Sequence, residues 1–578
     1  MTNMIPASNA KRYDRQIRIW GPHGQARLEK SSVALLNCGP TGSETLKNLV
    51  LGGIGSFTIV DGHRVTSTDI GNNFFVHHSN LGESRAKVTT ELLKELNEAV
   101  AGSYVEEDPA VLLDSNPGFF SEFSLVVATQ MRETEMLRLE EICEQAKVPL
   151  LVVRIYGLVG YLRASLAEHR VIESKPDSAV DDLRMNQPWA ELQEFANSFD
   201  LSTIDDITLH HLPYAVLLIK AAAAWRAEHS SLPSTSKERR DFKESIGNMK
   251  RMAGEVPVES ENFDEAVKAA FQVWTAYAVP SEVRLLLDDE QSSVTTDSDE
   301  FWIMVASLKA FLEHEGSGCL PLDGSIPDMH ATTDLYLRIQ RLYRECADRD
   351  VQAVERHARA LLQELGRDAE SVSTETVRCF CKNARNLRVV RYRSLREELG
   401  AASQRSAALQ KALTGESTAP AMYFYVLLRA VDRFHVQHGR YPGSHDDTLE
   451  DDVTALRAMA NQAWRLFGGR HVSTPAGFVP LGPNTQSETG VLESALPCCW
   501  RAAVGVATHG APPDSSAISE DYIVEMVRCG AGELHVMGAF MGGVAAQEAI
   551  KLITRQFVPV AGTMIYNAIG CTTTVLEL

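Results

Sequence analysis

The N-terminal part of the chain alternates short apolar runs with segments of helical periodicity. Val33-Ala34-Leu35-Leu36 is wholly apolar, as expected of a strand that is covered on both faces. Residues 39–42 interrupt this run with glycine and proline, and apolar positions then recur at helical spacing until Gly52-Gly53. A second apolar run, 57–60, ends at Asp61. This order predicts a strand, a helix and a second strand, which together form a βαβ unit.

The same alternation continues to about residue 165, in the apolar and helical segments 125–128, 133–145 and 148–153. The middle of the chain is different, because it carries long helical patterns: 214–227, 301–314, 334–346, 351–365 and 421–438. Apolar residues at helical offsets, such as Phe301, Val305 and Leu308, are typical of the buried stripes of a helical bundle. We therefore expect an α/β part followed by a mostly helical part.

The end of the chain returns to the α/β pattern. Residues 475–513 hold six prolines and few charges, and we interpret this segment as a long loop or insertion. Two helical patterns and two short strands follow it, at 522–529, 536–553, 564–566 and 573–576. We expect the C-terminal strands to complete the first sheet around an inserted helical middle. The predicted segments are therefore 1–168, 169–467, 468–518 and 519–578.

Composition narrows the possible partners and compartments. The 578 residues include 56 basic and 76 acidic ones, a net charge of −20, which disfavours nucleic acid as a partner. None of the ten cysteines forms a C-x-x-C motif, so neither a zinc ribbon nor a disulfide framework is expected. No uncharged apolar stretch reaches membrane-spanning length, and the first residues do not resemble a signal peptide. We expect a protein of the cytoplasm or nucleus without membrane contact.

The turn of the βαβ unit is a poor phosphate-binding loop. In the pattern G-x-G-x-x-G, the three glycine positions fall at Asn37, Gly39 and Gly42, and Pro40 adds a residue without an N–H. Such a loop works by pointing backbone donors at phosphate oxygens. Asp61 nevertheless stands where a ribose-binding acid is expected. From these residues alone, a turn that binds no nucleotide and a Rossmann oxidoreductase that uses Gly39, Gly42 and Asp61 for NAD(P) both remain open.

Several longer strings carry a resemblance to a known family. They are Tyr13-Asp14-Arg15-Gln16-Ile17-Arg18-Ile19-Trp20-Gly21, Gly55-Ser56-Phe57-Thr58-Ile59-Val60-Asp61, Gly71-Asn72-Asn73-Phe74-Phe75, Arg154-Ile155-Tyr156-Gly157, Arg429-Ala430-Val431-Asp432-Arg433 and Gly439-Arg440-Tyr441-Pro442-Gly443. Over nearly its full length, the chain resembles the regulatory subunits of neddylation-activating enzymes, the amyloid precursor protein-binding or auxin-resistance type. The resemblance places it in the ThiF/MoeB-like ubiquitin-activating superfamily and implies an inactive adenylation domain with a large inserted helical domain.

The resemblance also implies a division of labour between two chains. Such a subunit pairs with a catalytic subunit that holds ATP, Mg²⁺ and the thioester cysteine and that activates a ubiquitin-like modifier. Where active relatives carry nucleotide or metal ligands, this chain has Asn37, Pro40, Gly71-Asn72-Asn73, Arg85 and Met131. We therefore expect no cofactor or metal in this chain and a vestigial loop of Asn37, Gly39, Pro40, Gly42 and Asp61.

Arg15 is the one candidate catalytic residue. In the wider family, the arginine of this motif reaches across the dimer to the ATP phosphates of the other half, and the motif is intact here. A guanidinium suits this role because it stays charged and donates two parallel hydrogen bonds. The string alone favours a surface salt bridge instead.

The remaining reactive residues favour ordinary structural roles. Neither Cys319 nor Cys498-Cys499-Trp500 has the flanking residues of a catalytic thiol. The pairs His77-His78 and His210-His211 lack further metal ligands. Two alternatives within binding proteins stay open, namely a pure scaffold and the regulatory subunit of the sumoylation-activating enzyme, although the latter lacks so long a helical middle.

Overall fold

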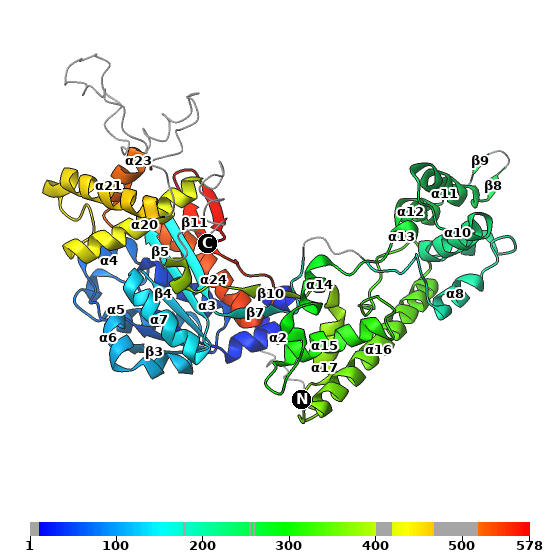
Figure 1. The fold of residues 1–578 in the computed structure, drawn as a ribbon, viewed down its shortest axis with the longest axis horizontal. Helices are drawn as coiled ribbons and strands as arrows, with labels where there is room; N and C mark the ends of the chain where they lie inside the picture. Colours follow the sequence, from blue (N-terminus) through cyan, green and yellow to red (C-terminus); the bar gives the residue numbers. More distant parts are fainter. Residues whose placement is uncertain (1–10, 177–180, 254–255, 258–259, 400–418, 467–517) are drawn as a thin grey trace, which may run out of the picture. The chain divides into compact units, whose positions relative to one another are not determined.

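The computed structural model describes residues 11–176, 181–253, 256–257, 260–399, 419–466 and 518–578 (Figure 1). The expected loop at 468–518 and the Cys498-Cys499-Trp500 string lie outside these residues, apart from Ile518. The chain forms two compact units. Unit 1 consists of residues 1–169 and 390–578, and unit 2 of residues 170–389.

Unit 1 is built on an eight-stranded sheet of order β12-β11-β6-β5-β4-β1-β2-β3. Five strands are parallel: β1 (Ser32–Leu36), β2 (Ser56–Val60), β3 (Ala101–Val105), β4 (Leu125–Thr129) and β5 (Leu150–Tyr156). Their order, 3-2-1-4-5, is that of a doubly wound nucleotide-binding sheet. The predicted α/β class is therefore confirmed.

The other three strands extend this sheet in antiparallel fashion. They are β6 (Val159–Ser165), β11 (Thr563–Asn567) and β12 (Thr572–Leu576). The last two come from the C-terminal end of the chain, so the prediction that this end completes the first sheet is also confirmed.

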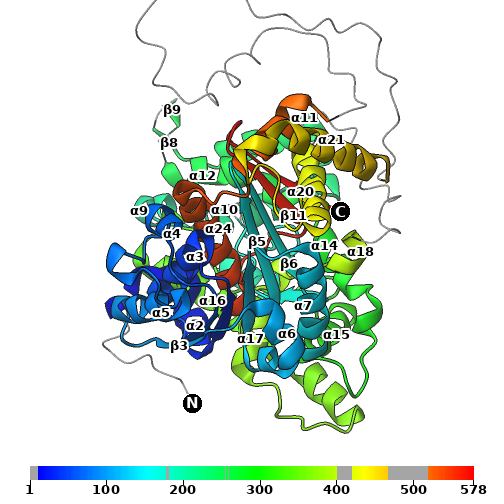
Figure 2. The same ribbon diagram turned by 90° about the vertical axis from the view of Figure 1, so that its left-hand side faces the viewer.

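Helices cover both faces of the sheet, because successive residues of each central strand point into different cores. Val33 and Leu35 of β1 belong to one core, and Ala34 and Leu36 to the other. The first face carries α2 (Asp14–Lys30), α3 (Pro40–Gly52), α5 (Arg85–Leu96) and α24 (His535–Thr554). The second carries α6 (Pro109–Ser115), α7 (Glu133–Ala146), α20 (Ala419–His438), α21 (Leu449–Leu466) and α23 (Glu520–Cys529) (Figure 2). The apolar runs of the sequence reflect this two-sided burial.

The helical insertion ends earlier than the sequence suggested. We expected it to reach residue 467, but α20 and α21 belong to unit 1, where α20 lies beside β11 (Figure 1). A buried ion pair joins α20 to the sheet, since Arg154 of β5 donates to both oxygens of Asp432 at 2.7 Å. The periodicity of α20 shows an apolar stripe but not the surface that the stripe covers, which explains the error.

Unit 2 is helical. Its helices are α8 (Ala190–Asn197), α9 (Asp206–His210), α10 (Tyr214–His229), α11 (Ser236–Asn248), α12 (Glu261–Ala269), α13 (Phe271–Trp274), α14 (Ser281–Leu287), α15 (Glu300–Glu313), α16 (Thr333–Glu364) and α17 (Thr374–Lys382). The patterns at 334–346 and 351–365 form the single helix α16, whose first half packs in one core and whose second half packs in another.

Two short strand pairings complete the description. Strands β7 (Glu168–Val171) and β10 (Arg388–Arg391) form a two-stranded sheet where the chain passes between the units. Strands β8 (Met252–Ala253) and β9 (Val256–Pro257) form another.

In the described part of the chain, α24 is the one helix long and apolar enough to cross a membrane, but half of it is buried and it packs on α3, as core helices do.

Candidate functional site

The candidate site lies at the carboxyl ends of β1, β2 and β4, where the strand order reverses and doubly wound folds bind their ligands. Asn37 follows β1 with a left-handed backbone, φ 63°. Its side-chain amide donates to the carbonyl of Thr129 at 2.9 Å, and the Thr129 hydroxyl donates to the carbonyl of Asn37 at 2.6 Å. These two hydrogen bonds tie the ends of β1 and β4 together at the switch point.

Gly42 of the turn is required for packing, whereas Gly39 meets only the end of a side chain. A Cβ atom on Gly42 would lie 2.3 Å from the carbonyl oxygen of Asn37, so only glycine lets α3 approach β1 this closely. A Cβ on Gly39 would lie 2.9 Å from the Oε1 atom of Glu533. Pro40 occupies the first turn of α3, where its missing N–H costs no helical hydrogen bond. Gly42 thus keeps the close packing of helix on strand that is typical of nucleotide-binding turns.

A carboxylate of the chain itself occupies the N-terminus of α3. The Oε2 atom of Glu533 accepts hydrogen bonds from the Thr41 hydroxyl at 2.7 Å and from the Thr41 amide at 3.4 Å. Burial raises the pKa of this carboxyl. In a working nucleotide site, phosphate oxygens take this position, because the helix dipole and free amides favour an anion. Glu533 follows Thr41 by 492 residues, and no motif in the sequence links the two positions.

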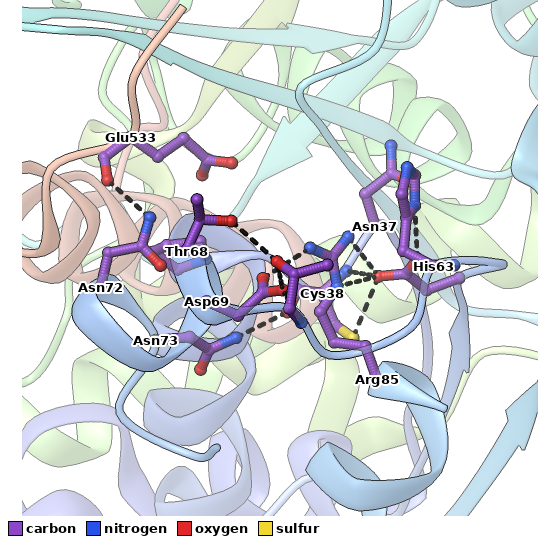
Figure 3. Close-up of polar contacts among 12 residues, drawn as sticks. Asn37, Cys38, His63, Thr68, Asp69, Asn72, Asn73, Arg85 and Glu533 are labelled. Atoms are coloured by element: carbon purple, nitrogen blue, oxygen red, sulfur yellow. Dashed lines mark hydrogen bonds and ion pairs between the residues drawn. The ribbon is translucent and has the colours of Figure 1, made fainter. Parts of the chain in front are cut away.

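The Asp61 carboxylate is buried, and both of its oxygens accept hydrogen bonds. Its side chain is 0% exposed. Its Oδ1 atom accepts hydrogen bonds from the backbone amide and the Nδ1 atom of His63, both at 2.9 Å. Its Oδ2 atom accepts from the Cys38 amide at 2.9 Å and from Arg85 Nε at 2.8 Å (Figure 3). Asp61 caps the turn through its contact with His63, and Arg85 and Cys38 cover the carboxylate that was expected to face a ribose.

Arg85 holds two carboxylates at once. Besides Asp61, it donates from Nη1 to Asp69 at 2.9 Å, and Asp69 also accepts from the amide and hydroxyl of Thr66. Burial on its own would raise the pKa of Asp61, but the hydrogen bond from His63 and the charge of Arg85 outweigh it and lower this pKa well below its usual value. Asp61 is therefore a permanent partner of Arg85 at neutral pH.

The segment Gly71-Asn72-Asn73 closes the remaining side of the crevice. Asn73 donates to the carbonyl of Cys38 at 3.1 Å and accepts from the Ser43 hydroxyl at 3.2 Å. Asn72 donates to the backbone carbonyl of Glu533 at 3.1 Å (Figure 3). These contacts join the C-terminal end of α4 (Ser67–Asn72) and the following Asn73 to Glu533 and to the turn after β1.

These residues do not fit a nucleotide or its metal ion. The Glu533 carboxylate lies at the helix N-terminus, where phosphates would need hydrogen-bond donors. Both oxygens of Asp61 already accept hydrogen bonds from the chain itself, so the ribose of ATP or NAD(P) could bind Asp61 only if these contacts broke. Met131, at the position of a metal-binding acid, is 1% exposed within the core. Among the described residues, no group of three or more His, Cys, Asp or Glu side chains could hold a metal.

Arg15 lies in the first turn of α2 and is exposed. It has no hydrogen bond or ion pair to any other described residue, whereas Arg18, one turn later, pairs with Asp14 at 3.1 Å. Tyr13 is buried, and its hydroxyl accepts from Asn97 at 2.8 Å, which fixes the start of the helix. The motif thus anchors α2 and leaves the Arg15 guanidinium available at the surface.

The other candidates have structural partners or raised pKa values. Cys319 is half-buried, and burial raises the pKa of its thiol, which lowers its thiolate fraction. The ring of His211 stacks on His330 at 5.1 Å, and its Nδ1 atom lies 2.7 Å from the carbonyl of Ile207. His77 is exposed.

Comparisons with known proteins give a consistent result. The model of the ThiF family matches residues 13–573. A NEDD8-activating enzyme E1 regulatory subunit AXR1 from Arabidopsis thaliana is 42% identical, and the match covers 98% of this chain and 96% of that protein. NEDD8-activating enzyme E1 regulatory subunits from Gallus gallus (41% identical, 98% of each chain) and Drosophila melanogaster (34% identical, 99% of this chain and 98% of that one) also match.

Proposed function

Since the chain belongs to the ThiF family and, within it, to the regulatory subunits of NEDD8-activating enzymes, we propose that it works as the noncatalytic half of a heterodimer. The catalytic subunit would hold ATP, Mg²⁺ and the thioester cysteine, and would activate the ubiquitin-like modifier NEDD8. This chain would bind no nucleotide of its own. We also propose that it acts in the cytoplasm or nucleus, where cysteines that form no disulfide framework are usual.

The observation that carries this proposal is the internal occupation of the nucleotide crevice. The Glu533 carboxylate bonds to Thr41 at the N-terminus of α3, and Arg85 neutralises Asp61. A triphosphate would have to displace a carboxylate from the α3 terminus, and its ribose would have to break a buried ion pair. Binding would therefore begin with a large unfavourable free energy. The same argument weighs against an NAD(P)-dependent oxidoreductase.

We further propose that Arg15 acts on the reaction in the partner subunit. Its exposed guanidinium has no partner among the described residues of its own chain, and Tyr13 and Asn97 hold the helix from which it projects. Placed against ATP phosphates across the dimer, it would offset the charge that develops as the modifier's carboxylate displaces pyrophosphate. Positively charged hydrogen-bond donors aimed at such developing charge commonly contribute a hundredfold or more to rate.

Pyrophosphate exchange by the assembled heterodimer tests this role. We expect Arg15→Ala to slow modifier-dependent exchange by roughly a hundredfold, by analogy with the loss of one charge-stabilising donor. Arg18→Ala is the matched control, because Arg18 lies on the same helix and pairs only with Asp14 among the contacts known for it. An Arg15→Ala enzyme as fast as the control would reject the trans-acting role, and would favour a scaffold that takes no part in adenylation.

A further inference from the structure

Unit 2 contains a groove of about 390 Å³ that none of the functions above uses. Helix α16 forms one wall with Arg344, Ala347 and Val351, which lie on one face of the helix at intervals of three and four residues. Helix α17 adds Arg378 and Lys382, one turn apart. The non-helical segment 322–326 forms the third wall.

The floor of the groove is apolar. Ala347 and Val351 are buried, and so is Leu322 on the opposite wall. Gly324 brings the backbone of this wall close to the floor, since a Cβ placed on it would lie 3.1 Å from the Cβ of Ala347, and its φ of +76° also favours glycine. The result is a narrow channel rather than a flat surface.

The lining of the groove carries three basic side chains against two carboxylates, Asp323 and Asp348. Arg344, Arg378 and Lys382 are all exposed. Arg378 pairs with Asp348 across the groove, whereas Arg344 and Lys382 have no ion pair to a described residue. Two unpaired cations on either side of an apolar floor are notable in a chain of net charge −20, because most of the surface repels anions.

We propose that this groove binds a short acidic peptide segment of a partner protein. Carboxylates of the peptide would pair with Arg344 and Lys382, and one apolar side chain would rest on Ala347 and Val351. A peptide fits better than a phosphate group or a nucleic acid, because Asp323 and Asp348 also line the groove. These two carboxylates would repel dense phosphate charge, but can accept hydrogen bonds from peptide amides.

Fluorescence anisotropy with the full chain tests the proposal, which rests neither on Arg15 nor on the closed nucleotide crevice. The probe is a fluorescein-labelled peptide in which glutamate alternates with leucine. We expect the double variant Arg344→Glu/Lys382→Glu to bind it about tenfold or more weakly, because two attractions become repulsions. A rise in ionic strength from about 0.05 M to about 0.5 M should weaken binding to the native chain several-fold.

The control variant is Lys237→Glu/Lys243→Glu, which makes the same charge change at two exposed lysines of α11 in the same unit. Its affinity should stay within about twofold of the native chain. Equal losses in both double variants would overturn the proposal, since general charge would then explain binding. Tighter binding of a labelled oligouridylate than of the peptide would also overturn it, and so would no measurable peptide binding. Unchanged thermal melting of both variants shows that the fold is intact.

Discussion

At the scale of single residues, Asp61 shows how a position can be kept while its role changes. It stands at the end of β2, where a ribose-binding acid is expected, yet it accepts hydrogen bonds from Cys38, His63 and Arg85. Burying a carboxylate costs several kcal/mol unless a cation and donors compensate it. The same residue that would recognise a nucleotide therefore stabilises the loop around it.

Removal of Arg85 should expose this dependence. We expect Arg85→Met to lower the free energy of unfolding by about 3–5 kcal/mol at pH 7, because Asp61 and Asp69 lose their shared cation. Urea unfolding followed by circular dichroism measures this change. Arg64→Met serves as the control, since Arg64 is exposed and donates only to the carbonyl of Gly82 among its known contacts, and it should cost less than about 1 kcal/mol.

The effect of Arg85→Met should depend on pH in a defined direction. The pKa of Asp61 is lowered in the folded chain, so its contribution to stability is complete above its ordinary value of 3.8 and is lost as pH falls through the lower folded pKa. In the variant, burial without Arg85 should raise this pKa instead. The difference in unfolding free energy between native chain and variant should therefore shrink from pH 7 to about pH 4. A constant difference would contradict the ion-pair explanation.

Glu533 offers a second test at this scale. Thr41 is 0% exposed, and in Glu533→Ala its hydroxyl and amide lose their acceptor, which should cost about 1–3 kcal/mol. Glu533→Gln retains an acceptor oxygen and should lose less than half as much. Thermal melting of the two variants distinguishes them. If both melted with the native chain, Glu533 would not stabilise the site.

At the scale of elements, α24 and α3 pack closely because of two glycines one turn apart. A Cβ on Gly538 would lie 3.2 Å from Pro40, and one on Gly542 would lie 2.8 Å from the Cβ of Glu44 and 2.9 Å from the Thr45 amide. Small residues at this spacing let helix backbones approach each other. This close contact also brings Glu533, just before α24, to the N-terminus of α3.

Two adjacent glycines of α24 make a matched pair of substitutions. We expect Gly542→Ala to destabilise the chain by about 1–3 kcal/mol, since its methyl group meets the backbone of α3. Gly543→Ala should instead be neutral or stabilising by up to about 1 kcal/mol, because a Cβ there would meet no other described element within 4 Å and alanine favours helix. Denaturant midpoints give both values. Equal effects of the two substitutions would show that helix packing does not control this position.

At the scale of the whole molecule, we expect nucleotides to leave the thermal stability of the isolated chain unchanged, because its own side chains occupy the nucleotide crevice. A ligand that binds only the folded state at a hundred times its Kd stabilises a protein by about 2.7 kcal/mol. We therefore expect millimolar Mg·ATP or NADPH to leave the melting temperature of the isolated chain unchanged within about 1 °C. An increase of several degrees that saturates with concentration would refute the absence of a nucleotide site in this chain.

The local features of the fold could be predicted from the sequence. The βαβ unit, the helical middle and the returning C-terminal strands follow from periodicity and from glycine and proline positions, which act over a few residues. The sequence also shows the loss of the phosphate-binding pattern at Asn37 and Pro40, because this pattern too spans only a few residues. The boundary of the helical insertion was wrong, because an apolar stripe on α20 does not identify the surface that it covers.

The tertiary structure decided what fills the damaged turn. The contact between Glu533 and Thr41 spans 492 residues, and the Arg154–Asp432 ion pair spans 278. Local periodicity cannot reveal such contacts, because the two partners lie hundreds of residues apart in the sequence. The sequence determined that residues typical of a nucleotide site are replaced in this turn. The three-dimensional arrangement determined that Glu533 and Arg85 of the same chain occupy the site, because every buried charge in a folded protein needs a partner.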